Sequence, residues 1–176
     1  MMPAFELPRY KRHMTARDIP TPRKGRCCWC DGPLSGRQRR WCSVACLDDY
    51  GPRASGQIAR TLVERRDQGV CAGCGRDTRR LEAAVGRLLR TWGARAQHAD
   101  FRGYVDRRQR LVRVLGRMGL RAPHWTARGF DQHTWEADHI VPVVEGGGCC
   151  GLDNLRTLCL PCHRRETAAL AGRRRG

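Results

Sequence analysis

Apolar residues recur at three- and four-residue steps in three stretches of the chain, which is the pattern of amphipathic helices. The first stretch covers about residues 56–67, and the others are centred on residues 81–92 and 111–118. The inward positions are Ile58, Leu62 and Val63, then Leu81, Val85, Leu88, Leu89 and Trp92, then Leu111, Val112, Leu115 and Met118. The sequence therefore predicts three helices, and arginines occupy their polar faces.

A different pattern follows near the C-terminus. Residues 135–141 and 155–160 are typical of two strands, and a glycine-rich loop at 142–153 separates them. A helix is expected from Cys162 onward. This strand, loop, strand, helix unit of roughly 35 residues is too small to be stable through an apolar core of its own.

Composition points the same way for the whole chain of 176 residues, of which 40% are hydrophobic and only 6% aromatic. Such a chain is expected to form one domain or two small ones with thin cores. It contains no apolar run long enough for a signal peptide or a membrane span. We therefore expect no membrane association and an intracellular, cytoplasmic location, where cysteines stay reduced.

The charge is strongly positive, because 34 Lys and Arg residues outweigh 17 Asp and Glu residues to give a net charge of +17. Almost all of these cations are arginine, whose planar fork matches phosphate oxygens in pairs. Nucleic acid is the expected partner, since neutralising its phosphates releases counterions. Double-stranded or branched DNA is favoured, RNA is possible, and the sequence does not indicate an oligomeric state.

Eight of the eleven cysteines form two sets with zinc-ligand spacing. The first set combines a C-x2-C and a C-x3-C pair, which predicts a small zinc module at residues 26–50 with four thiolate ligands. Its cysteines are Cys27, Cys30, Cys42 and Cys46. Cys28 is an alternative to Cys27 as the first ligand. Arg37, Arg39 and Arg40 lie in the intervening loop and are expected to contact nucleic acid.

The second set joins two C-x2-C pairs, Cys71 with Cys74 and Cys159 with Cys162, that are far apart in the chain. A zinc ion shared by these four thiolates would crosslink distant segments and contribute about 10 kcal/mol or more to folding. Two structural zinc ions are thus expected. Cys149 and Cys150 fit neither set and are expected to be ordinary loop residues.

Four polar residues around the predicted strands suit phosphodiester hydrolysis. Asp138 offers a carboxylate oxygen and His163 an imidazole nitrogen, which together leave open positions on a catalytic Mg²⁺ or Mn²⁺. His139 can act as general base, because the pKa of imidazole is near neutrality. Asn154 is placed to hold the imidazole of His139 by a hydrogen bond. Arg164 and Arg165 follow His163 and are further candidates for contact with nucleic acid.

These residues resemble the HNH endonuclease family, whose fold is the ββα-metal motif. The resemblance rests on Asp138-His139-Ile140-x-Pro142, the glycine loop at 146–148, Asn154-Leu155-x-x-Leu158-Cys159-x-x-Cys162-His163, and Glu166-Thr167. It implies that Asp138 and His163 bind the catalytic metal, that His139 activates water, and that Asn154 orients His139. In layout the chain is nearest to the nuclease domain at the C-terminus of a vertebrate annealing helicase.

The fold class expected from these observations is α+β, small and zinc-stabilised. It comprises a basic, disordered tail at 1–25, the zinc module at 26–50, a linking helix at 51–70 and a nuclease domain at 71–172. That domain contains a helical insertion at 78–130 and a ββα-metal core at 135–172.

The expected function is a metal-dependent DNA endonuclease that nicks as a monomer. The alternative is a non-catalytic, zinc-dependent protein that binds nucleic acid. Charge does not separate the two, but the joint presence of Asp138, His139, Asn154 and His163 favours the nuclease, since a binding protein has no need of this set.

Overall fold

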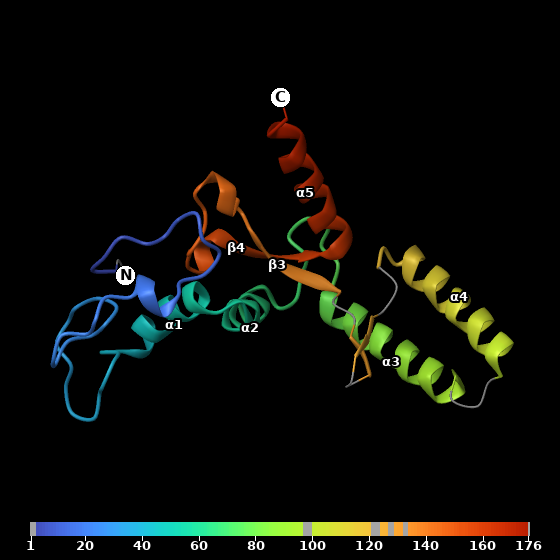
Figure 1. Ribbon diagram of the computed structural model, residues 1–176, viewed down its shortest axis with the longest axis horizontal. Coiled ribbons are helices and arrows are strands. Elements are labelled where there is room, and N and C mark those ends of the chain that lie inside the picture. The colour runs from blue at the N-terminus through green and yellow to red at the C-terminus, as the bar shows by residue number, and fades with distance from the viewer. Residues whose placement is uncertain (1–2, 97–99, 121–123, 127–128, 132–133, 176) are drawn as a thin grey trace. The chain divides into compact units, whose positions relative to one another are not determined.

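The computed structural model describes residues 3–96, 100–120, 124–126, 129–131 and 134–175 (Figure 1). The predicted helical insertion at 78–130 therefore falls partly outside the described residues. Two compact units are present, and each combines two stretches of chain. One contains residues 1–68 and 137–156, and the other contains residues 69–136 and 157–176. The mixture of helices with small two-stranded sheets confirms the α+β class.

In the first unit, two consecutive helices follow the N-terminal cysteines. Helix α1 (Val44–Ala54) begins at Ser43, whose side chain accepts a hydrogen bond from the backbone N–H of Cys46. Helix α2 (Gly56–Asp67) begins at Ser55, whose side chain accepts from Ile58 N in the same way. Such N-caps satisfy backbone donors that a helix start leaves unpaired, each worth about 1 kcal/mol.

The N-terminal segment differs from the prediction of a disordered tail. It contains a short 3-10 helix, η1 (Ala16–Asp18), closed by the side chain of Asp18, which accepts from the backbone and hydroxyl of Thr15. Met14 is 5% exposed and belongs to a core cluster with Trp29 and Cys149. Apolar side chains of this segment are thus packed against the cysteine-rich region.

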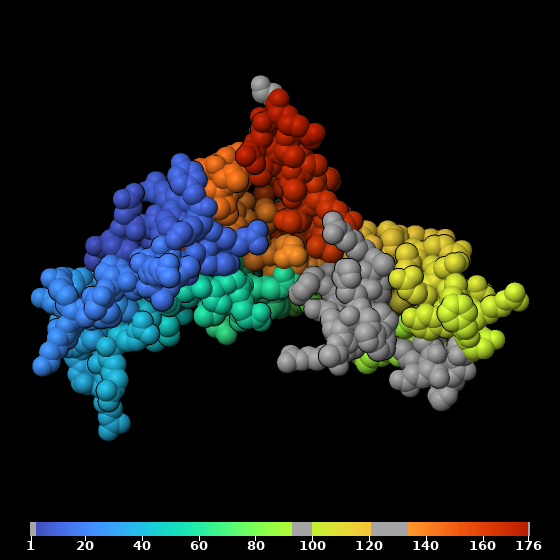
Figure 2. Space-filling view, in the orientation of Figure 1, coloured from blue at the N-terminus to red at the C-terminus, as the bar shows by residue number. Residues whose placement is uncertain are grey.

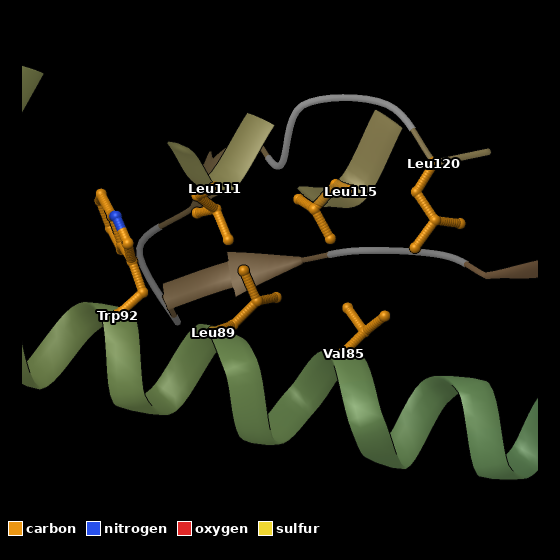
Figure 3. Packing of buried hydrophobic residues seen from close by; sticks show 6 residues of the cluster. All are labelled: Val85, Leu89, Trp92, Leu111, Leu115 and Leu120. Carbon is orange, nitrogen blue, oxygen red and sulfur yellow. The ribbon is translucent and has the colours of Figure 1, made fainter. Parts of the chain in front are cut away.

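The second unit is built on a helical pair. Helices α3 (Thr78–Ala96) and α4 (Phe101–Arg117) pack together, and their buried side chains interdigitate (Figure 3). The cluster consists of Val85, Leu89, Trp92, Leu111, Leu115 and Leu120. Five of these six were predicted as inward positions, which confirms the helical periodicity. A short antiparallel pair, β1 (His124–Thr126) and β2 (Gly129–Asp131), follows α4.

The predicted strand, loop, strand, helix order is observed at the C-terminus. Strands β3 (Trp135–His139) and β4 (Leu155–Cys159) form a two-stranded sheet, and helix α5 (Leu160–Arg173) follows at once (Figure 1). The connecting loop contains two 3-10 turns, η2 (Val143–Glu145) and η3 (Leu152–Asn154). The division between the two units falls within both strands.

Two features of the helices differ from the sequence prediction. In α2, Ile58 is exposed although it was predicted to face inward, whereas Val63 is buried as predicted and Ala59 is buried beside it. Helix α1 was not predicted as a helix in its own right, because Gly51 and Pro52 interrupt its pattern. None of the described helices combines the length and apolar character needed to cross a bilayer.

Candidate functional site

The end of β3 presents two adjacent polar residues, Asp138 and His139, and both side chains are partly buried. The carboxylate of Asp138 is held by Arg156 on β4. Nε of Arg156 donates to Oδ2 of Asp138 at 3.0 Å, and Nη2 lies 3.0 Å from the same oxygen. The guanidinium thus pairs with the carboxylate whose oxygens would be available to a metal cation.

The surroundings of His139 keep its imidazole neutral. Burial lowers its pKa most, and the positive charge of Arg12 lowers it further, while the carboxylate of Asp138 acts in the opposite direction. His13 also contributes to the lowering. A neutral imidazole has a nitrogen lone pair that can accept a proton, which is the state that a general base needs.

The side chain of Asn154 closes the loop that follows His139. Its Oδ1 accepts from the backbone N–H of Val141 at 2.8 Å, and its Nδ2 donates to the carbonyl oxygens of Val141 at 3.1 Å and Gly147 at 2.9 Å. The backbone carbonyl of Asn154 also accepts from Ile140 N at 2.9 Å. These bonds are directed at the backbone immediately after His139.

A glycine is required at position 147 for this arrangement. A Cβ there would overlap the carbonyl oxygen of Val141 and lie 2.8 Å from Nδ2 of Asn154. The glycine-rich loop noted in the sequence thus allows backbone and side chain to approach closely.

His163 belongs to the other unit. It lies in the first turn of α5, directly after the buried Cys162, and its carbonyl accepts from the hydroxyl of Thr167 at 3.0 Å. Pro161 lies in the first turn of α5, where a backbone N–H would have no partner within the helix, so the proline is tolerated there. The helix start therefore fixes the backbone that carries this imidazole.

The N-terminal cysteines form a cluster whose four ligand atoms all lie within 4.8 Å of one another. Sγ of Cys42 lies 3.4 Å from that of Cys30 and 3.5 Å from that of Cys46. Tetrahedral zinc with Zn–S bonds of about 2.3 Å places sulfurs about 3.8 Å apart, close to these separations. The fourth member of this cluster is Cys27, and Cys28 lies outside it.

Hydrogen bonding in this cluster favours a thiolate at Cys27. Burial opposes ionisation, but the backbone N–H groups of Cys30, Trp29 and Cys42 outweigh it and lower the pKa of Cys27 to about 6. Burial raises the pKa of Cys28, which lies outside the cluster. Since zinc binds thiolates, the site suits zinc at Cys27 and not at its neighbour.

The second predicted tetrad is also assembled, by Cys71, Cys74, Cys159 and Cys162. Sγ of Cys74 and Sγ of Cys159 are 3.7 Å apart, and Cys159 N donates to Sγ of Cys71 at 3.3 Å. Although burial opposes it, such backbone donation lowers the pKa of Cys71 to about 7. Both tetrads fit zinc, and among the described residues they are the groups of three or more possible metal ligands. Cys149 and Cys150 belong to neither.

The arginines expected to bind nucleic acid are all exposed. Arg40 lies over the ring of Trp41, with 5.5 Å from Cζ to the ring centroid. Arg164 donates to the carbonyl of Gly119, and Arg165 donates to Sγ of Cys162 at 3.2 Å. The second of these bonds places positive charge beside a cysteine tetrad, although burial and the neighbouring cysteines raise the pKa of Cys162 to about 12.

Comparison with known proteins indicates the protein family to which this site is similar. Residues 127–169 match the model of the HNH endonuclease family, and this segment includes Asp138, His139, Asn154 and His163. The resemblance noted in the sequence is thereby confirmed for the strand, loop, strand, helix unit. The match supports nuclease chemistry on nucleic acid, carried out with a divalent metal.

Relatives extend the likeness beyond that segment. Over 136 residues, or 77% of this chain, the sequence is 36% identical to the mouse DNA annealing helicase and endonuclease ZRANB3 and 33% identical to the human and bovine proteins of that name. The match spans only 12% of the mouse and bovine proteins and 11% of the human protein. No solved structure matches the chain.

Sequence reasoning missed two features of the site. Arg156 stood inside the quoted motif as an unassigned position, and only the pairing of β3 with β4 shows that it faces Asp138. Opposite charges on neighbouring strands could have indicated it. Arg12 and His13 come from the segment predicted to be disordered, and no local pattern marks them as charges that lower the pKa of His139.

Proposed function

We propose that this protein is a metal-dependent DNA endonuclease that hydrolyses phosphodiester bonds. The observation that carries the proposal is the hairpin of β3 and β4, which brings Asp138, His139 and Asn154 together within the segment that matches the HNH family. The names of the relatives include an endonuclease, which supports the same reaction class.

In this proposal, His139 accepts the proton of the attacking water, as its neutral imidazole allows. Asp138 and His163 hold one Mg²⁺ or Mn²⁺, and their oxygen and nitrogen donors suit such an ion. When bound, the cation would stabilise the negative charge that develops on the phosphate and on the leaving oxygen. Because Arg156 pairs with the same carboxylate, a bound cation would have to compete with its guanidinium for Asp138.

Asn154 acts as a positioning residue. Because its amide is bonded to the backbone of Val141 and Gly147, it fixes the chain that follows His139 and so the direction of the imidazole. This route runs through the backbone, whereas the family resemblance implies a direct bond to the ring.

Binding of DNA is assigned to the arginine surface and to the zinc modules. Arg37, Arg39 and Arg40 project from the first zinc module, and Arg164 and Arg165 from the start of α5. A single base and a single metal serve one strand, so a monomer should nick duplex or branched DNA. Reduced thiols at both tetrads support an intracellular site of action.

Supercoiled plasmid is the direct test. The purified protein with Mg²⁺ or Mn²⁺ should convert it to the open-circular form, and a His139→Ala variant should bind the plasmid without cutting it. A linear product at the earliest times would contradict nicking by a monomer. An intact plasmid across metals and buffers, with binding retained, would instead establish the non-catalytic binding protein.

A further inference from the structure

Helix α4 of the second unit carries most of its arginines on the side that faces away from the core. The helix contains six arginines and a single carboxylate, that of Asp106. Leu111 and Leu115 are buried and point toward α3, so they mark the inner side of the helix (Figure 3). At 3.6 residues per turn, four arginines lie on the opposite side, within about 80° of one another around the helix axis. We call these the α4 arginine stripe: Arg102, Arg110, Arg113 and Arg117.

The α4 arginine stripe is open to solvent along the length of the helix. All four of its side chains are exposed, and Figure 2 shows the yellow atoms of α4 at the surface that is in view. A rise of 1.5 Å per residue places Arg102 and Arg117 about 22 Å apart along the axis. Nε of Arg113 donates to the carbonyl of Gln109 in the same helix at 3.5 Å, so this guanidinium lies along the outer surface of α4.

Helix stability does not account for this arrangement. Arg102 lies in the first turn, where the helix dipole favours acidic side chains and disfavours cations. Arg117 lies in the last turn, where a cation is favourable, but Arg110, Arg113 and Arg117 are three and four residues apart, and like charges at these spacings destabilise a helix. Asp106, four residues from both Arg102 and Arg110, offsets only part of the charge. An anionic ligand along the helix would relieve the repulsion.

The buried side of α4 decides which anionic surface fits the stripe. An amphipathic helix binds a membrane by burying its apolar side at the lipid boundary, and in α4 that side is packed against α3. A nucleic-acid strand needs only the charged side, because arginine pairs its planar fork with phosphate oxygens. Over about 22 Å, a strand that rises about 3.4 Å per nucleotide presents about six phosphates, so four arginines can each reach a different one.

We infer that the α4 arginine stripe binds the phosphate backbone of the DNA substrate. The inference rests on the proposed function for DNA as the partner. It adds a binding element outside residues 127–169, the segment that matches the HNH family. Phosphate contacts hold and position a nucleic acid without reading its sequence. The stripe therefore supplies affinity and salt dependence, and it does not supply sequence preference.

The test replaces all four arginines of the stripe by glutamine in a His139→Ala background, which leaves the DNA uncut. Glutamine removes the charge and forms helices about as well as arginine. The control changes the net charge equally, because it replaces four exposed arginines from other parts of the described chain by glutamine: Arg17, Arg65, Arg87 and Arg174. Binding to a short fluorescein-labelled DNA duplex is measured by fluorescence anisotropy over a range of salt.

The stripe variant should reduce the slope of log affinity against log salt by about 3–4, since each phosphate contact contributes about 0.9. The control should reduce it by less than half as much. A reduction of less than about 2 in the stripe variant, or a control that reaches half of its effect or more, would overturn the inference. Arg113→Gln alone should reduce the slope by about 1, and this single variant decides the matter if the fourfold variant does not fold.

The experiment keeps this inference apart from the proposed function, because it measures binding alone. If the original protein binds DNA but never nicks it, the proposed function fails, and the salt slope still decides about the stripe. A second arm uses vesicles of phosphatidylserine and phosphatidylcholine. Vesicle binding that the stripe variant loses, together with an unchanged salt slope on DNA, would overturn the inference and assign the stripe to a membrane surface.

Discussion

Arg156 and Asp138 face each other across β3 and β4, with Nε and Nη2 of the arginine each 3.0 Å from Oδ2 of the aspartate. The two side chains are 26% and 16% exposed, so the pair is shielded from water. It occupies the carboxylate that the proposed function assigns to the metal. A divalent cation bound there would therefore compete with the guanidinium for the same negative charge.

Replacement of Arg156 by alanine should have opposite effects with and without metal. In metal-free buffer the free energy of unfolding should fall by about 1–2 kcal/mol, because a shielded carboxylate loses its partner. Added Mg²⁺ should then raise the melting temperature of Arg156→Ala by more than it raises that of the original protein, since the competing cation is gone. Thermal unfolding over a series of Mg²⁺ concentrations measures both. An equal response to Mg²⁺ would contradict the competition.

Asn154→Ala removes three hydrogen bonds to the loop backbone. The free energy of unfolding should fall by about 2 kcal/mol or more, because the buried carbonyl of Gly147 and the amide of Val141 lose their partners. Nicking should slow because the chain after His139 is no longer held. Urea unfolding and plasmid nicking measure the two effects. The exposed neighbour Asp153 supplies the control, since Asp153→Ala should leave both nearly unchanged.

How much of this site could be predicted depended on how local its signals were. The tetrads follow from short spacings, and the helical pair follows from the period of Val85, Leu89 and Leu115. Arg156 could not be assigned, because its partner depends on how two strands pair. Nor could the packing of Met14, a single apolar residue among charged ones with no period to mark it.

The backbone of Arg9 and Lys11 packs so closely against Gly148 that a side chain at position 148 should not be tolerated. Gly148→Ala forces a methyl group onto the carbonyls of Arg9 and Lys11, which should cost about 1–3 kcal/mol of stability. Gly172→Ala is the matched control, because its Cβ meets open space in α5 and should stabilise by up to about 1 kcal/mol. Thermal unfolding compares the two. Similar melting temperatures would mean that the segment does not rest on the loop.

The number of zinc ions bound per chain should equal the number of intact cysteine tetrads. Elemental analysis of the intact protein should return about two zinc ions per chain. Cys42→Ser and Cys74→Ser should each lose one, because either removes a ligand from a separate cluster. Cys28→Ser should keep both, since Cys28 lies beside Cys27 but outside the cluster. Retention of two zinc ions in Cys42→Ser, or loss of one in Cys28→Ser, would refute the assignment of the first site.

The stability contributed by Asp18 in the N-terminal segment should be lost at low pH. Hydrogen bonds from Lys11 and Thr15 lower the pKa of Asp18 to about 2, below its usual value of 3.8. The ionised carboxylate therefore stabilises the fold fully above pH 3.8, and this contribution is lost as the pH falls toward 2. Asp18→Asn should abolish this part of the pH dependence and leave the rest of the curve in place. Carboxylate titration by NMR, together with thermal unfolding from pH 5 to roughly pH 2, checks it. An Asp18 that titrates near 3.8 would show that the segment is not held in this way.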